Sequence, residues 1–191
     1  SVLLEDPFMK ELVTQWVAHL NLCNAVTGAE VWFLAFNKGY TRLGKIFTRV
    51  ALEEYLSTSL KTMKGNLVGP LIRMYADDAS FKSCGALEEC GSEISRNIPP
   101  IKNEMSFGYG AWLISLMESI AERGSQVAVN ELEEKCGWCS STGWSHQEYQ
   151  RVLDLLERKN LLSVDRHMSP WIIKAKESSA VLWGRLYNDL I

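Results

Sequence analysis

The sequence lacks the features of a membrane or secreted protein. Within its 191 residues, no apolar run approaches the roughly 18 residues that a membrane-spanning helix needs. No basic N-terminal region precedes an apolar stretch, so we see no secretory signal. The five cysteines are odd in number and lack the spacing of a secreted disulfide framework. We therefore expect reduced thiols and an intracellular protein, cytoplasmic or nuclear.

An excess of positive charge is also missing. The net charge is −3, and it is spread evenly along the chain. Residues 1–100 hold ten Lys/Arg and eleven Asp/Glu, and residues 101–191 hold ten and twelve. Neither half has the excess of Lys and Arg that is typical of a protein that binds nucleic-acid phosphates over a wide surface. This balance weighs against strong nucleic-acid binding and leaves a local basic patch open.

Catalytic signatures are absent as well. The chain contains no GxxxxGK[ST], GxGxxG or HExxH motif, and no Ser or Cys stands beside a His and an acid in a nucleophile signature. The three histidines, His19, His146 and His167, are scattered. We expect a protein that is not an enzyme and needs no cofactor.

The composition is that of a folded protein, with 47% apolar and 23% charged residues and seven tryptophans. Apolar residues at helical spacing predict a helical bundle over residues 1–81, with helices beginning near Asp6, Thr27, Thr41 and Asn66. Residues 82–104 are polar and rich in Gly and Ser, which predicts a linker, with a short helix around Ala86–Ile94 as an option.

Residues 105–191 carry clearer local signals. We expect a helix around Trp112–Ala121 and a helix from Val129 to Cys136, and Ser125-Gln126-Val127-Ala128 between them could hold one short strand. Ser145 and Glu148 have the spacing of a capping box, and the helix they begin has Lys159-Asn160 at its end. Two β-prone runs, 161–164 and 171–174, then predict a hairpin, and a last helix follows over 178–190.

This order of elements, from about Gly110 to Lys174, resembles the winged-helix family. The resemblance implies a winged-helix-like segment with a small β-hairpin. Together with the N-terminal helical bundle and the C-terminal helix that the apolar spacing predicts, it leads us to expect a mainly α chain. One departure is the loop from Trp138 to Trp144, which is longer than the tight turn of a helix-turn-helix.

The resemblance also points to candidate partner-binding residues on the capped helix and the hairpin. These are Gln147, Gln150, Arg151, Arg158, Arg166 and His167. Gln and Arg can read base edges, but Glu148, Asp154 and Glu157 on the same helix would face phosphates. We therefore expect a protein partner, and an adaptor or assembly module within a larger complex. A DNA- or RNA-binding protein is the alternative.

Cys136-Gly137-Trp138-Cys139 is a CxxC motif. A zinc site needs four ligands, and only Cys84, Cys90 or His146 could complete it. Because none of them forms a second CxxC or a matching His pair, we interpret Cys136 and Cys139 as thiols beside a tryptophan and expect no metal.

Two short stretches suggest a second alternative. Arg49-Val50-Ala51-Leu52, with Tyr75 and Ala79 downstream, resembles the centre of RUN domains. The run from Ala51 to Leu56, with Gly69, resembles part of a Ras GTPase-activating domain. Both resemblances imply a small-GTPase effector or regulator that acts through the N-terminal helices.

Overall fold

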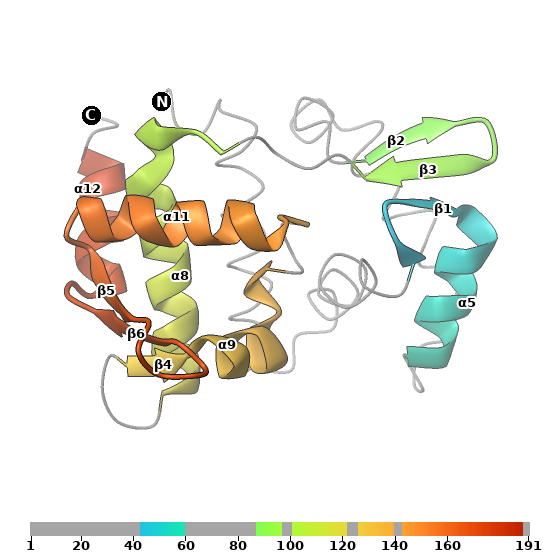
Figure 1. The fold of residues 1–191 in the computed structure, drawn as a ribbon. Helices are drawn as coiled ribbons and strands as arrows, with labels where there is room; N and C mark the ends of the chain where they lie inside the picture. The colour runs from blue at the N-terminus through green and yellow to red at the C-terminus, as the bar shows by residue number, and fades with distance from the viewer. Residues whose placement is uncertain (1–42, 60–86, 97–100, 122–125, 140–142, 189–191) are drawn as a thin grey trace. The chain divides into compact units, whose positions relative to one another are not determined.

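The computed structural model describes residues 43–59, 87–96, 101–121, 126–139 and 143–188. These residues fall into two compact units (Figure 1), one with residues 43–59 and 87–96 and the other with residues 101–121, 126–139 and 144–188. The helices predicted to begin near Asp6, Thr27 and Asn66 lie outside the described residues, as does the helix start at Thr41.

The first unit holds a helix and a three-stranded antiparallel sheet. Its elements are β1 (Ile46–Thr48), α5 (Arg49–Ser59), β2 (Leu87–Cys90) and β3 (Glu93–Arg96), with the strand order β1-β3-β2. Leu52 and Leu56 of α5 are buried, as is Ile94 of β3. Arg49 at the start of α5 donates to the Glu89 carboxylate of β2 at 2.7 Å. The helix is thus tied to the hairpin by both apolar burial and an ion pair.

The β2–β3 hairpin closes through a two-residue turn. Cys90 pairs with Glu93, which leaves Gly91 and Ser92 as the loop, and Gly91 has a φ of +64°. Two-residue hairpin turns need a positive φ at the first loop position, which glycine adopts without strain. The Gly-Ser pair was therefore a hairpin signal inside the segment that we predicted to be a linker.

The prediction of a mainly α chain with an N-terminal helical bundle is wrong. The described residues contain two three-stranded antiparallel sheets beside their helices. Residues 46–48, expected in a helix, form β1, and the optional helix around Ala86–Ile94 is the β2–β3 hairpin. The cause is tertiary: β1 pairs with β3, whose residues are 45 to 49 positions away in the sequence, and such a pairing overrides weak local propensity.

The stretches that suggested a small-GTPase partner are only partly described. Residues 51–56 lie in α5, where Leu52 and Leu56 face the core of the first unit. Gly69, Tyr75 and Ala79 lie outside the described residues. The resemblance to RUN and GTPase-activating domains stays a prediction.

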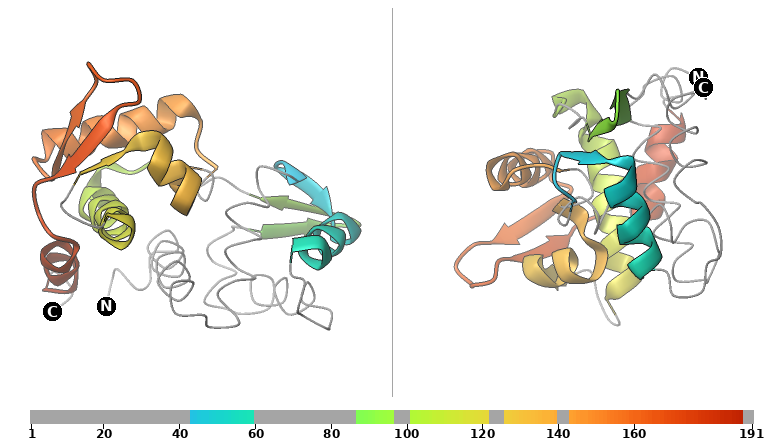
Figure 2. Two further views of the ribbon diagram at one scale, coloured as in Figure 1. Left: turned by 90° about the horizontal axis from the view of Figure 1, so that it is seen from below. Right: turned by 90° about the vertical axis from the view of Figure 1, so that its right-hand side faces the viewer.

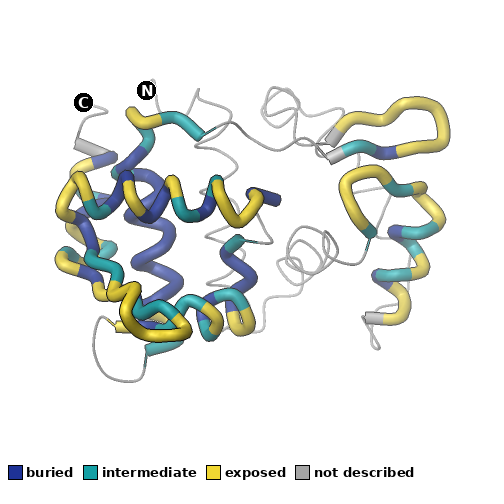
Figure 3. Tube along the Cα trace, in the orientation of Figure 1, coloured by how far each residue is buried: buried dark blue, intermediate teal, exposed yellow. Residues whose placement is uncertain are grey.

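The second unit is built around α8 (Ser106–Ile120), which follows the short 3-10 helix η2 (Asn103–Met105). Every residue of α8 from Gly108 to Met117 is buried (Figure 3). The helix begins earlier than expected and is apolar on all sides instead of amphipathic. Yet no helix in the described part of the chain, α8 included, is long and apolar enough to cross a membrane.

Other helices cover α8 from several directions. Figure 2 shows α11 (His146–Arg158) and α12 (Ser179–Asn188) on opposite sides of α8, and α9 (Val129–Cys136) also packs on it. The Trp183 indole of α12 donates to the Ser115 hydroxyl of α8 at 3.0 Å. The Glu118 carboxylate accepts from the backbone N–H and hydroxyl of Ser179 at the start of α12, where the helix dipole favours an anion.

A three-stranded antiparallel sheet completes the second unit. It consists of β4 (Gln126–Ala128), β5 (Leu162–Asp165) and β6 (Ile172–Ala175) in the order β4-β6-β5. Ile173 of the central strand is opposite Val127 on one side and Val164 on the other. The short strand that residues 125–128 could hold and the predicted hairpin are thus confirmed, as are the helix over 129–136 and the capped helix from Ser145.

Gly110 is a position of close packing on α8. A Cβ at this position would lie 3.0 Å from Leu161 Cδ1 and 3.3 Å from Leu182 Cδ1. Both leucines are fully buried, so neither can move without disturbing the core. Gly184 of α12 offers a contrast, because a Cβ there would meet nothing within 4 Å.

We predict opposite effects for alanine at these two helical glycines. Gly110→Ala should destabilise the protein by about 1 kcal/mol, since overpacking costs about 1–3 kcal/mol and helix propensity returns about 1 kcal/mol. Gly184→Ala should stabilise it by up to about 1 kcal/mol. Urea unfolding of the full chain, followed by tryptophan fluorescence, measures both changes. Equal stabilisation by the two substitutions would contradict the packing around α8.

Candidate binding site

The first turn of α11 is held by its N-cap. The Ser145 hydroxyl accepts from the Glu148 N–H at 3.3 Å, and the Glu148 carboxylate accepts from the Ser145 N–H at 2.7 Å. This is the predicted capping box. It fixes the start of the helix, and with it the positions of His146 and Tyr149 in the first turn.

The β5–β6 hairpin is attached to α11 through Glu157. One oxygen of this carboxylate accepts from the Val164 N–H of β5 at 2.7 Å, and the other accepts from Arg166 at 2.5 Å. Arg166 also donates to Asp154 at 2.6 Å, and its guanidinium lies 5.3 Å from the centroid of the Trp171 ring. Two carboxylates and one indole thus hold Arg166 against the helix.

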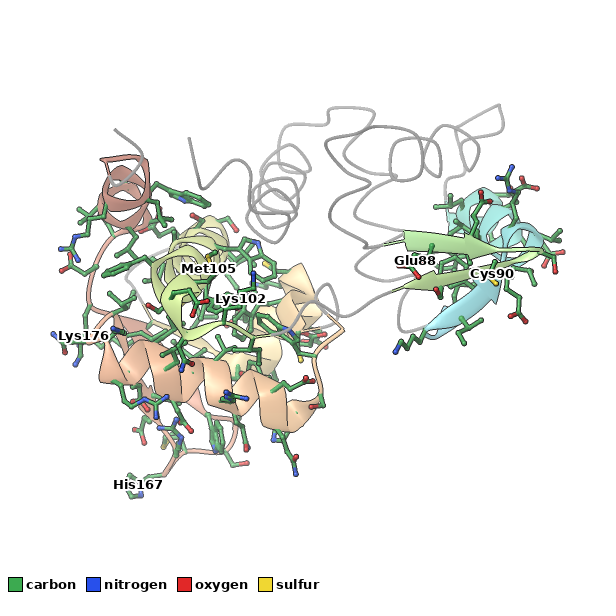
Figure 4. The ribbon with its side chains drawn as sticks, turned by 90° about the horizontal axis from the view of Figure 1, so that it is seen from above. Glu88, Cys90, Lys102, Met105, His167 and Lys176 are labelled. Carbon is green, nitrogen blue, oxygen red and sulfur yellow. The ribbon has the colours of Figure 1, made fainter. Side chains whose placement is uncertain are left out.

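The predicted partner-binding residues are therefore in different environments. Gln147, Arg151 and Arg158 are exposed, and neither arginine forms an ion pair within the described residues. Gln150 is hydrogen-bonded to His146, with 2.9 Å between the side-chain nitrogens. Arg166 is engaged as above, and His167 stands exposed at the tip of the hairpin (Figure 4). Whether these residues bind a partner stays a prediction.

A cavity of about 490 Å³ lies beside the start of α11, and we call it the aromatic cavity. Its walls come from four segments: α9, the loop after α9, the first turn of α11 and the hairpin connection. The residues that line it are Val129, Asn130, Leu132, Glu133, Trp138, Cys139, His146, Tyr149, Ser169, Pro170 and Trp171. A volume of this size is in the range of small-molecule and peptide side-chain pockets.

The rings of the cavity form a continuous series. The Trp138 and Tyr149 rings meet edge to face with their centroids 5.0 Å apart, and His146 lies 6.0 Å from Tyr149. The Trp171 ring lies 6.4 Å from His146. Trp138 is buried in the core and Trp171 is half-buried. The series thus leads from the core of the second unit to its surface.

Two polar groups sit among these rings, the Tyr149 hydroxyl and the Glu133 carboxylate. The Tyr149 hydroxyl is buried and has no hydrogen-bond partner among the described residues. Burial raises the pKa of Tyr149, and the nearby Cys139 and Glu133 raise it further, so the hydroxyl is protonated at neutral pH. The hydroxyl is therefore a polar group whose hydrogen-bonding capacity is unused, which costs free energy in a buried setting.

Glu133 and Cys139 join the end of α9 to the loop that follows it. The Glu133 carboxylate accepts from the Cys139 N–H at 2.7 Å, and Gly137 ends the helix in the left-handed conformation with a φ of 57°. The Cys139 thiol donates to the Trp144 carbonyl at 3.5 Å. Together these bonds direct the loop so that Trp138 turns inward and Cys139 lines the cavity.

The CxxC motif is not part of a metal cluster in the described residues, where no three His, Cys, Asp or Glu side chains are grouped to hold an ion. Cys136 is buried and Cys139 is partly buried. Cys84, one of the residues considered for completing a zinc site, lies outside the described residues. Among the described cysteines, Cys90 is exposed and forms no disulfide bond.

The cavity was not predicted from the sequence, although some of its residues had been noted. Trp138 and Cys139 belong to the CxxC motif, and His146 was a candidate zinc ligand. Glu133, Tyr149 and Trp171 were not predicted to be site residues. The extra length of the loop from Trp138 to Trp144 was the available signal, because a tight turn would leave no room for the inward tryptophan.

We predict that Cys139 resists alkylation. Burial, reinforced by Glu133 and Glu148, raises the pKa of its thiol to about 12. At pH 8 only about one Cys139 thiol in ten thousand would then be the reactive thiolate. Iodoacetamide on the native full chain should therefore label the exposed Cys90 and spare Cys139, as measured by peptide mass mapping. In urea Cys139 should be labelled, and equal labelling of both residues in native protein would contradict this environment.

Comparisons of the chain with protein-family models, with curated proteins and with solved structures find no match. Similarity therefore assigns the chain to no family. Its function has to be inferred from the aromatic cavity and from the charges around α11.

Proposed function

We propose that the protein is a non-enzymatic interaction module that assembles with another protein. The binding surface consists of the first turn of α11, the β5–β6 connection and the aromatic cavity between them. Aromatic residues and arginine are enriched at the centres of protein interfaces, whereas Lys, Asp and Glu are depleted there. The cavity matches that composition, with four aromatic rings and one carboxylate among its lining residues.

The observation that carries the proposal is the engagement of Arg166. This residue was one of the two hairpin residues expected to contact a partner, and Asp154 and Glu157 already compensate its charge. A phosphate would have to compete with both carboxylates for the guanidinium. The surface beside it has apolar and aromatic character instead, and Met168 at the hairpin tip is exposed by 53%. Such a surface favours a protein partner.

We also propose that the protein acts inside the cell, in the cytoplasm or nucleus. The exposed thiol of Cys90, which forms no disulfide bond among the described residues, supports this proposal. Cysteines stay reduced in these compartments and commonly pair in oxidising ones.

We predict that a photo-crosslinker at Met168 will capture a specific protein in host cells. Benzoylphenylalanine at Lys176 is the matched control, because this exposed residue lies apart from the hairpin tip marked by His167 (Figure 4). The crosslink from position 168 should be lost in the His146→Ala variant, which removes an exposed ring of the cavity wall. Identical products from positions 168 and 176, or no effect of His146→Ala, would reject this surface.

Nucleic-acid binding remains the alternative, and one observation favours it. Gln147, Arg151 and Arg158 are exposed on α11, and the two arginines have no ion-pair partner among the described residues. Glu148 and Asp154 on the same helix oppose this positive charge.

We expect the full chain to show no salt-dependent binding to a random DNA duplex, as measured by fluorescence anisotropy. If the alternative is correct, binding appears at low salt, and Arg151→Ala lowers both the affinity and the dependence on salt. Gln147→Ala is the control at a nearby exposed position. It should leave non-specific binding unchanged, since it removes no charge.

A further inference from the structure

The aromatic cavity has the electrostatic character of a site for a cation. Among the described residues that line it, Glu133 is the only acidic one and none is Lys or Arg. Glu148 lies close enough to act on the pKa of Cys139, which places a second carboxylate nearby. A cation beside the cavity is Arg166, whose charge Asp154 and Glu157 compensate. The described surroundings of the cavity therefore carry a net negative charge.

The rings of the cavity add to this preference. The faces of Trp and Tyr rings are negative, and they attract a cation placed within about 6 Å. The protein itself provides an example, because the Arg166 guanidinium lies 5.3 Å from the centroid of the Trp171 ring. Trp171 also lines the cavity. A guanidinium is flat and weakly hydrated, so it stacks on such rings more readily than a lysine ammonium does.

The Tyr149 hydroxyl is a second, independent observation. Tyr149 is only 3% exposed and lines the cavity, and its hydroxyl has no hydrogen-bond partner among the described residues. The hydroxyl oxygen can accept from an N–H donor. A guanidinium carries five such donors in a rigid plane, so one ligand group can meet a carboxylate, a hydroxyl and an aromatic face together.

We propose that the aromatic cavity binds an arginine side chain of the partner protein. The guanidinium lies against the aromatic rings of the cavity and donates hydrogen bonds to Glu133 and to the Tyr149 hydroxyl. The apolar stem of the arginine contacts Leu132 and Pro170. This inference rests on the proposed function, since it names the group that the interaction surface recognises.

The test is a titration of the full chain with Nα-acetyl-argininamide at low ionic strength, followed by the NMR signals of the tryptophan indole N–H groups. The neutral isostere Nα-acetyl-citrullinamide should bind at least about fivefold more weakly, because it lacks the charge that the rings and Glu133 attract. Nα-acetyl-lysinamide should also bind more weakly than the arginine compound. Added salt should weaken the binding of the arginine compound more than the binding of the neutral citrulline compound.

Two variants with matched controls locate the site. Glu133→Gln keeps an oxygen for the Cys139 N–H and removes the charge, and it should weaken argininamide binding about fivefold. Glu134→Gln makes the same charge change on the next residue, which is exposed and does not line the cavity, and it should have little effect. Tyr149→Phe should keep the fold, because the hydroxyl has no partner among the described residues, and should weaken binding about threefold.

Several outcomes would overturn the proposal. Equal binding of argininamide and citrullinamide excludes a charge-selective site, and equal binding of lysinamide excludes a preference for guanidinium. If argininamide does not bind, the cavity is not an arginine site. If Glu133→Gln and Glu134→Gln have equal effects, the cation does not bind at Glu133. If a crosslink from position 168 still depends on His146, the proposed function stands and only the arginine assignment fails.

Discussion

Burial of α8 around its whole circumference is the constraint on which the second unit depends. A helix that is apolar on all sides must be covered on all sides, and α9, α11 and α12 together provide much of that cover. Gly110 lets leucines from three segments approach the helix, because a Cβ there would lie within 3.5 Å of Leu161, Leu182 and Leu156. The positions of α9 and α11 follow from this packing, and the aromatic cavity lies where these two helices meet the hairpin connection.

Protection of a sheet edge and placement of Trp171 beside the cavity depend on the same set of side chains. Glu157 supplies an acceptor to the backbone of the edge strand β5 and also holds Arg166. This arrangement places Trp171 beside the cavity, and it removes Arg166 from the cations available to a phosphate. A side chain that resembles a nucleic-acid contact in the sequence is therefore a structural link between the hairpin and α11.

The second unit was predicted more fully than the first for a physical reason. The Ser145–Glu148 capping box, the left-handed Gly137 and the hairpin strands are local signals, formed by residues close together in the chain. The first unit depends on pairing between β1 and β3, and the Gly91-Ser92 turn was its one local sign. Only Ile94 is buried in that hairpin among the side chains that the structure describes, so alternation of apolar residues could not identify the strands.

The sequence by itself determined the helix boundaries at Ser145 and Gly137, the hairpin and the absence of known catalytic motifs, because each depends on residue type at short spacing. Tertiary structure alone decided that α8 is buried on every side and that Arg166 forms ion pairs with Asp154 and Glu157. It also decided that Glu133, Tyr149 and Trp171 line one cavity. Those three residues come from a helix, a second helix and a hairpin connection. Only the packing of these elements against one another brings their side chains together.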